Sequence, residues 1–316
     1  MKLSLLLLCL GIVLLSSGQQ PLKAYDIVYG KAVEWNGESN DLKLDIFYYQ
    51  QEKPKPLILF MHGGGFISGR KESYRSFCEN LAKRGFVVAN VTYRQGVSKD
   101  RQAFKLEIAK AVYRAQQDAA TSVRFLLHNA LNFGIDTTKI IIGGSSAGGI
   151  TALGVAFFSQ AEWDALMPSF KSDLGPVDSI SSAKTSDKIK AVINLWGGIA
   201  DTSLISGNEV RRIPVLLMHS KADENIAYEL AKNRNVLNPT LMGSYDIAQR
   251  YRNNNGCFQL FYAEDARHGY GFSGAYTITA IEAFVTDIIR QSCSRDEIKH
   301  VNARGSDFVQ KYGEED

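Results

Sequence analysis

The sequence shows no large excess of either charge, no apolar run long enough to span a membrane, and no internal repeat. Its 36 basic and 33 acidic side chains nearly balance, which argues against nucleic acid or an anionic membrane as the main partner. The apolar run Leu3–Leu15 is about thirteen residues long, too short to cross a bilayer. It follows Met1 and Lys2 and precedes the small residues Ser16–Gly18, a pattern typical of a secretory signal peptide at residues 1–18. The sequence therefore predicts a secreted or periplasmic protein.

Cysteine is also scarce, with four in the chain. Cys9 lies in the predicted signal peptide, so three remain and one of them must stay unpaired. Cys257 precedes the last expected strand and Cys293 follows the last expected helix. Because the chain runs up that strand and back down that helix, both should lie at one end of the sheet. We predict a Cys257–Cys293 disulfide, suited to an exported protein, that contributes about 3 kcal/mol.

The most informative segment is the sequence IIIGGSSAGG at residues 140–149. Three β-branched residues run into a G-x-S-x-G pattern centred on Ser146, and an apolar helix-like run follows. A buried strand that turns sharply into a helix is the context of a nucleophile elbow. Such a turn exposes the serine hydroxyl above the sheet and leaves no room for a Cβ atom at Gly144 or Gly148. The alternative is a glycine-rich loop that happens to contain serines.

A serine nucleophile needs a histidine base, because its hydroxyl is unreactive at neutral pH. In this kind of sheet the chain order is serine, acid, histidine. Of the five histidines, only His268 and His300 lie far enough downstream. His300 lies in a polar tail, whereas His268 follows an alternating strand at residues 258–263. We therefore predict His268 as the base.

The acid that orients the base should follow the apolar strand Pro214–Met218. Asp223 lies in the loop just past this strand and is the predicted acid. Glu224, its neighbour, is an alternative. Asp201 and Asp265 are weaker candidates, the latter because it is close in sequence to the base.

An oxyanion hole is the third requirement. The sequence HGGGF at residues 62–66 follows the strand Pro56–Met61. Consecutive glycines let backbone N–H groups approach a substrate, and the N–H of Ala147 at the start of the elbow helix can complete the hole. His62 itself, and His219 in the matching place on a later strand, are interpreted as structural.

These motifs resemble the α/β-hydrolase superfamily, and within it the carboxylesterases with an HGGGF loop. The resemblance covers roughly residues 25–292 and rests on HGGGF, on GSSAG at residues 144–148, and on the segments that contain Asp223 and His268. It implies that the N–H groups of Gly64 and Gly65 form the oxyanion hole together with Ala147. It also implies that no metal or organic cofactor is required.

Two segments depart from the hormone-sensitive-lipase-like branch of these enzymes. Ser145 stands where that branch usually has Asp. The sequence HSKADENIAY at residues 219–228 is more similar to the feruloyl-esterase-like and prolyl-oligopeptidase-like branches. These departures leave the three catalytic candidates in place and leave the substrate open.

The fold class expected from the order of elements is α/β, with a mostly parallel eight-stranded sheet flanked by helices, as in the α/β-hydrolase fold. The first two strands should form an antiparallel hairpin. One catalytic domain is expected at 19–295, with a loose polar tail at 296–316. The expected strands are Ala24–Trp35, Asp41–Tyr49, Pro56–Met61, Phe86–Tyr93, Lys139–Gly143, Ile189–Trp196, Pro214–Met218 and Phe258–Ala263.

The substrate pocket is the least determined part. Segments 159–188 and 197–212 are longer than minimal connections, so we expect them to line the pocket. Phe66 and Trp196 are candidate substrate contacts, and a core position is the alternative for Trp196.

The function expected is therefore a secreted serine esterase acting on short-chain or aryl esters. Export and the resemblance extend this expectation to acetyl or feruloyl groups on polysaccharide. The alternatives are a peptidase or amidase with the same three residues, and a non-catalytic binding protein on a hydrolase scaffold.

Overall fold

The computed structural model describes residues 21–49, 52–98, 102–177, 188–232, 240–292 and 297–301. The predicted signal peptide, residues 1–18, lies outside these ranges, as does 302–316. Within the ranges described, no helix is both long and apolar enough to span a membrane.

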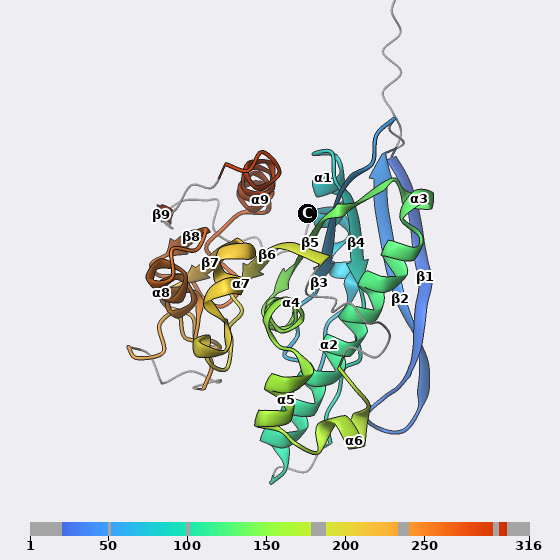
Figure 1. The fold of residues 1–316 in the computed structure, drawn as a ribbon, viewed down its shortest axis with the longest axis vertical. Coiled ribbons are helices and arrows are strands. Elements are labelled where there is room, and N and C mark those ends of the chain that lie inside the picture. Colours follow the sequence, from blue (N-terminus) through green and yellow to red (C-terminus); the bar gives the residue numbers. More distant parts are fainter. Residues whose placement is uncertain are drawn as a thin grey trace, which may run out of the picture.

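A single twisted sheet runs through the centre of the molecule (Figure 1). Its nine strands lie in the order β1-β2-β4-β3-β5-β6-β7-β8-β9. β1 pairs antiparallel with β2, and β2 antiparallel with β4; every other neighbouring pair is parallel. The strands are β1 (Pro21–Val33), β2 (Ser39–Tyr49), β3 (Lys55–Met61), β4 (Val87–Val91), β5 (Ile135–Ser145), β6 (Ile189–Leu195), β7 (Val215–Ser220), β8 (Phe258–Ala263) and β9 (Glu297–Val301).

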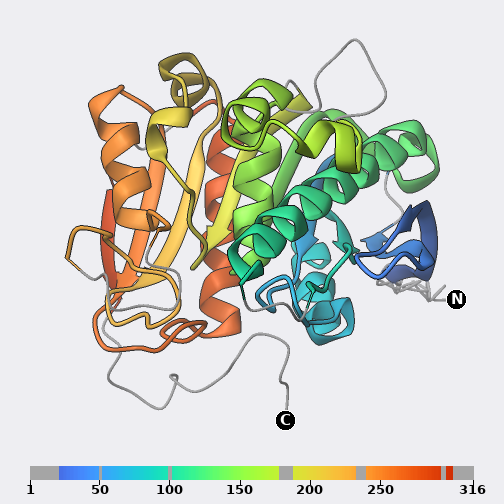
Figure 2. The ribbon, with the colours of Figure 1, turned by 90° about the horizontal axis from the view of Figure 1, so that it is seen from below.

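Helices cover both faces of this sheet, so its central strands are buried on both sides and show no alternation of apolar and polar residues. The helices α2, α4 and α8 pack on one face and α1 and α9 on the other (Figure 2). In β3, for example, Leu57 and Leu59 belong to the first core and Ile58 and Phe60 to the second. The predicted α/β architecture is thus confirmed.

The helical segments connect successive strands. They are η1 (Lys71–Tyr74), α1 (Arg75–Ala82), α2 (Phe104–His128), α3 (Ala130–Phe133), α4 (Ala147–Phe157), α5 (Gln160–Leu166), α6 (Phe170–Leu174), η3 (Thr202–Leu204), α7 (Gly207–Arg212), α8 (Ser244–Asn253) and α9 (Gly274–Ile289).

The register places the carboxyl ends of the central strands at one edge. Met61 at the end of β3 lies beside Gly144 of β5, and Ser145 lies beside Leu195 at the end of β6. In open α/β sheets ligands bind outside this carboxyl edge. We call it the catalytic edge below.

All eight predicted strands are present, and the structure adds a ninth. β9 lies inside the segment expected to be a loose tail, so that expectation was wrong for residues 297–301. The segment pairs in parallel with β8, from Gln259 beside Glu297 to Ala263 beside Val301. An edge strand offers unpaired N–H and C=O groups to any extended segment. A five-residue polar segment has too little hydrophobic pattern to reveal this from sequence.

The cysteines agree with the prediction as far as the described residues extend. Cys257 is disulfide-bonded and Cys78 is a buried free thiol. Cys293, the predicted partner of Cys257, lies outside the described residues, so the pairing stays a prediction.

Segment 159–188 is described up to residue 177, and this part packs against α2. The indole N–H of Trp163 donates to Gln116 at 2.8 Å, and the hydroxyl of Tyr113 donates to the carbonyl of Gly175 at 2.7 Å. Its place in the pocket wall stays a prediction.

Candidate active site

Ser146 occupies the turn between β5 and α4. Its backbone has φ 51° and ψ −116°, a conformation that is unfavourable for a residue with a side chain. The turn is fixed on both sides, because Ser146 N donates to Leu195 O at 2.8 Å and Ile150 N donates to Ser146 O at 2.9 Å. The strained turn therefore fixes the position of the hydroxyl.

The two glycines of the motif are required because the end of β3 lies against the elbow. A Cβ on Gly144 would come within 2.5 Å of the Met61 carbonyl oxygen, and one on Gly148 within 2.2 Å. Neither contact can be relieved, since the neighbour is backbone. The motif thus lets β3, and the glycine loop that follows it, approach Ser146 closely.

His268 lies within hydrogen-bonding distance of both Ser146 and Asp223. Its Nε2 is 2.8 Å from Ser146 Oγ, and its Nδ1 is 2.7 Å from Asp223 Oδ2. The three residues come from the ends of β5, β7 and β8. A neutral imidazole held in this way donates from Nδ1 to the carboxylate and presents a lone pair to the serine hydroxyl.

Asp223 is fully buried and is held ionised by its partners. Its Oδ1 accepts from the N–H groups of Asn225 and Ile226 at 2.8 and 2.9 Å. Burial alone would raise the pKa of this carboxyl group. The hydrogen bonds with His219 and His268 outweigh burial and hold the pKa well below its usual range. The carboxylate can therefore stabilise an imidazolium that forms at His268.

His219 contacts Asp223 directly. Its Nε2 is 3.2 Å from Asp223 Oδ2, and its Nδ1 is 3.0 Å from Ser244 Oγ. The sequence interpretation of His219 as structural omitted this contact. No motif could have revealed it, because the loop after β7 must fold back for the two residues to meet.

The alternative acids lie elsewhere. Glu224 accepts from the backbone N–H of His268 at 3.1 Å, so it supports the loop of the base but does not contact the ring. Asp201 caps η3 through Ser203 N at 2.7 Å. Asp265 is exposed.

The glycine loop after β3 has the backbone geometry expected of an oxyanion hole. Gly64 has φ 126°, and Gly65 and Phe66 each have φ 63°. The Gly64 carbonyl accepts from the N–H groups of Ile67 and Ser68 at 3.1 and 3.0 Å, which closes the loop. Among the described residues, the N–H groups of Gly64 and Gly65 have no hydrogen-bond acceptor. Ala147 is the first residue of α4, where N–H groups have no acceptor within the helix.

His62 supports this loop, as predicted for a structural residue. Its Nδ1 is 2.7 Å from the Gly63 carbonyl oxygen, and its carbonyl accepts from the Tyr93 hydroxyl at 2.8 Å. The ring stacks on Tyr93, with centroids 4.6 Å apart. Burial lowers the pKa of His62, so the imidazole is neutral.

The two predicted substrate contacts are both buried. Phe66 is 3% exposed and packs on Tyr93, with ring centroids 6.2 Å apart. Trp196 is 3% exposed, has φ 43°, and belongs to the core on the α1 side. A Cβ on Gly269 would lie 3.8 Å from its Nε1, so the indole lies beside the loop of His268. Contact with substrate stays a prediction for both residues.

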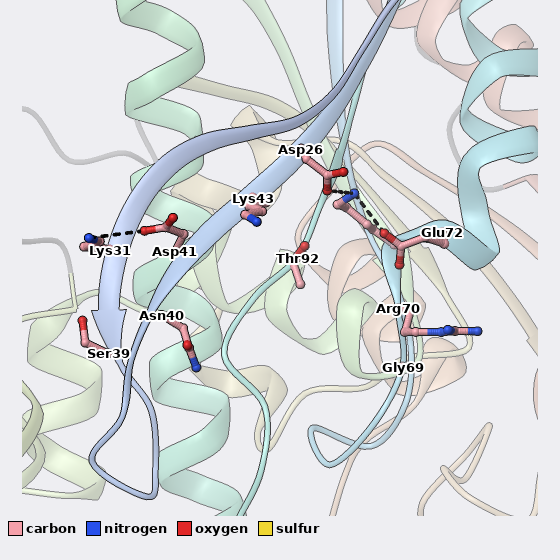
Figure 3. Close-up of a pocket in the computed structure, with 11 residues that line it drawn as sticks. Asp26, Lys31, Ser39, Asn40, Asp41, Lys43, Gly69, Arg70, Glu72 and Thr92 are labelled. Atoms are coloured by element: carbon pink, nitrogen blue, oxygen red, sulfur yellow. Dashed lines mark hydrogen bonds and ion pairs between the residues drawn. The ribbon is translucent and has the colours of Figure 1, made fainter.

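A cavity of about 580 Å³ lies beyond the glycine loop (Figure 3). It lies between the turn end of the β1–β2 hairpin and residues 69–72. Charged side chains dominate its lining, among them Lys31, Lys43 and Glu72. None of Ser146, Asp223 and His268 lines it. A charged cavity away from these three residues is unsuited to an apolar acyl chain.

The sheet topology, the elbow and the hydrogen-bonded serine, histidine and aspartate together define an α/β hydrolase. Solved structures agree. Esterase 2 of Thermogutta terrifontis, phosphorylated by paraoxon, matches with a TM-score of 0.62 and 20% identity, over 84% of this chain and 94% of its own. The propionate-bound form matches with a TM-score of 0.60 and 22% identity, over 86% of this chain and 95% of its own. At such identities the likeness concerns the fold.

The family follows from sequence. The sequence profile of the BD-FAE family matches residues 44–213, more than half of the chain, and the chain therefore belongs to this family.

Individual relatives match over shorter segments. Gut esterase 1 of Caenorhabditis elegans is 27% identical over 165 residues, which are 50% of this chain and 29% of the relative. Ethyl acetate hydrolase of Pseudomonas putida is 29% identical over 130 residues, 41% of this chain and 37% of the relative. The chain thus matches well under half the length of these relatives.

Proposed function

We propose that this protein is a serine esterase that cleaves carboxylic esters through an acyl-enzyme on Ser146. The observation that carries the proposal is the unbroken chain of hydrogen bonds from Ser146 Oγ through His268 to the buried, ionised Asp223. Esterases among the relatives and the fold neighbours support the same class of reaction.

The first half of the reaction acylates the serine. As Ser146 Oγ attacks the ester carbonyl carbon, His268 Nε2 takes the hydroxyl proton, and Asp223 stabilises the imidazolium. The carbonyl electrons move onto oxygen, where the N–H groups of Gly64, Gly65 and Ala147 stabilise the charge. When the tetrahedral intermediate collapses, the bond to the alcohol breaks and His268 returns the proton to the alcohol oxygen.

The second half releases the acid. Water replaces the alcohol, His268 takes a proton from it, and the resulting oxygen attacks the acyl carbon through a second intermediate. The bond to Ser146 Oγ then breaks and the serine regains its proton. The residues return to their starting state.

Short-chain or aryl esters are the proposed substrates. Support comes from the named activity of ethyl acetate hydrolase and from the propionate- and butyrate-bound forms of the Thermogutta esterase. Acetyl or feruloyl groups on polysaccharide are a narrower proposal, supported by the resemblance of residues 219–228 to feruloyl esterases. Export by a signal peptide at residues 1–18 belongs to the same proposal.

The test is hydrolysis of p-nitrophenyl acetate, butyrate and octanoate by wild type and Ser146→Ala. We expect the variant to lose at least about a thousandfold in kcat/KM. Ser122→Ala is the matched control, because this buried serine of α2 donates only to its own helix, to Ala119 O at 2.7 Å. A folded wild type that cleaves none of the three esters, or a Ser146→Ala variant that cleaves them as fast as wild type, would refute the proposal.

A further inference from the structure

Ser145 has a contact that the nucleophile motif does not explain. It ends β5 directly before Ser146 and is fully buried. Its Oγ lies 2.6 Å from the hydroxyl oxygen of Tyr74, the last residue of η1. Neighbouring residues of a strand face opposite sides of the sheet, so the two serine hydroxyls serve different partners: Ser146 faces His268 and Ser145 faces Tyr74.

Gly63 connects this hydroxyl pair to the glycine loop. A Cβ on Gly63 would lie 3.2 Å from both Ser145 O and Ser145 Oγ, and 3.3 Å from Ser146 Cβ. Gly63 therefore lies directly against the elbow. The Gly63 backbone also lies near enough to the Tyr74 phenol to lower the pKa of that phenol.

The phenol is well placed to hold both groups. Its ring packs on Phe60 and Phe77, with centroids 5.2 and 6.4 Å apart. Burial raises the pKa of Tyr74 and outweighs its hydrogen bonds with Ser145 and Gly63. The phenol therefore stays protonated and keeps a hydrogen for bonding.

The helix η1, which carries Tyr74, is itself fixed to the sheet. Lys71 Nζ contacts Asp45 at 2.6 Å, Asp26 at 2.9 Å and Glu72 at 3.0 Å. The Asn90 side-chain amide donates to the Lys71 carbonyl at 2.6 Å. Tyr74 thus connects the ion pairs of η1 on one side with Ser145 at the elbow on the other.

We propose that the hydroxyl pair Tyr74–Ser145 positions the oxyanion loop: it holds Ser145 where Gly63, at the start of the loop, packs against it, and so fixes Gly64 and Gly65 relative to Ser146. Tyr74 and Ser145 are positioning residues and contact no substrate. This inference rests on the proposed esterase function, and it explains why this chain has a serine at position 145.

The test is a double-mutant cycle on p-nitrophenyl acetate hydrolysis with Tyr74→Phe, Ser145→Ala and the double variant. Loss of an oxyanion donor itself costs about a hundredfold or more in kcat, so its misplacement should cost on the order of tenfold. We expect each single variant to lose about tenfold in kcat with KM changed by less than about twofold. The double variant should lose about tenfold as well, because the two hydroxyls act as one unit.

A structural effect alone is separated by a control and by the pH profile. Tyr251→Phe is the matched control, since this buried hydroxyl donates to Ile213 O at 2.6 Å, near the opposite edge of the sheet. It should lose thermal stability but keep kcat. The acidic limb of the pH profile of kcat/KM should not move in Tyr74→Phe, because His268 keeps its contacts with Ser146 and Asp223.

The outcomes separate the two proposals. An inactive wild type would overturn the esterase itself. If the wild type is active, three results would overturn only the positioning role. They are an unchanged kcat in Tyr74→Phe, a loss in the double variant equal to the product of the two single losses, and a loss of kcat in Tyr251→Phe equal to that in Tyr74→Phe. If Tyr74→Phe does not fold, Ser145→Ala decides the question by the same split between kcat and KM.

Discussion

The two sides of Ser146 work by different chemical means. On the β3 side the candidate groups are backbone N–H groups of Gly64 and Gly65, which carry no formal charge and depend on loop geometry. On the β7 and β8 side they are the side chains of His268 and Asp223, which depend on ionisation. The Gly64–Gly65 side therefore depends on rigid support of the loop, and the His268–Asp223 side depends on the charge of its side chains.

The supports differ accordingly. The loop side is held from outside by the buried Lys71, which is 3% exposed, and by Gln95, whose amide donates to Gly69 O at 3.1 Å. On the charged side, Asp223 is held by His219 and by the backbone N–H groups of Asn225 and Ile226. Substitutions on the charged side should therefore reduce activity through lost charge, whereas those around the loop should reduce it through lost geometry.

The largest effect is expected from Asp223→Asn. The amide cannot stabilise the imidazolium or hold the reactive tautomer of His268, so kcat should fall by on the order of a thousandfold or more. Glu224→Gln is the matched control, because its amide oxygen can still accept from His268 N–H, and it should stay within about threefold. Steady-state kinetics with p-nitrophenyl butyrate measures both. Equal losses of kcat in the two variants would show that Asp223 is not the acid that orients His268.

A smaller effect, confined to the loop side, is expected from Gly64→Ala. Its Cβ would lie 1.8 Å from Ser68 O, and φ is 126°, so the loop must move. We expect kcat to fall about a hundredfold, the scale of a lost oxyanion donor. Gly65→Ala meets no atom within 4 Å and has φ 63°, so it should lose less than about tenfold. The reverse order would contradict the assigned loop geometry.

Lys71→Met tests the external support. Removing the ammonium leaves the buried Asp45 with the Arg75 guanidinium, whose Nε is 2.7 Å away, and with the Asp26 backbone N–H at 3.0 Å. Breaking a buried pair leaves a poorly compensated charge, so the free energy of unfolding should fall by about 3 kcal/mol. Lys31→Met removes an exposed pair with Asp41 and should have no resolvable effect. Urea denaturation at pH 7 measures both, and equal stabilities would show that Lys71 is not an anchor.

The smallest effect concerns pH. Burial lowers the pKa of His62 in the folded protein below about 6.5, the ordinary value that it regains in the unfolded chain. At a pH between these two pKa values, the unfolded chain binds more protons than the folded protein. Stability from this group is present above pH 6.5 and is lost as the pH falls below it. The lowered pKa of Asp223 acts only below about pH 4. His62→Gln should therefore reduce the loss of unfolding free energy between pH 7 and pH 5. An unchanged or steeper loss in urea titrations would contradict this.

The sequence predicted the charged side better than the loop side. Ser146, Asp223 and His268 each follow a recognisable strand, and parallel strands bring their carboxyl ends to one edge, so their proximity could be anticipated. Their roles stay predictions. The loop glycines could also be named, because HGGGF follows a strand directly.

The supports of the loop side could not be predicted, since each joins residues distant in sequence. Lys71 meets Asp45 across 26 positions, and Tyr74 meets Ser145 across 71. Neither contact has a periodicity or motif. β9 was overlooked for a related reason, because its pairing is made by the backbone and leaves little trace in side-chain pattern.

The central claim is that Ser146 is a nucleophile activated by His268, and covalent labelling with paraoxon tests it most directly. Paraoxon, which phosphorylates the Thermogutta esterase, would exchange its p-nitrophenolate for Ser146 Oγ. The account predicts one diethylphosphoryl group on the peptide that contains Ser146 in wild type, and none in Ser146→Ala or, at the same exposure time, in His268→Ala. A folded wild type that stays unlabelled, or a label on another residue that persists in Ser146→Ala, would contradict it.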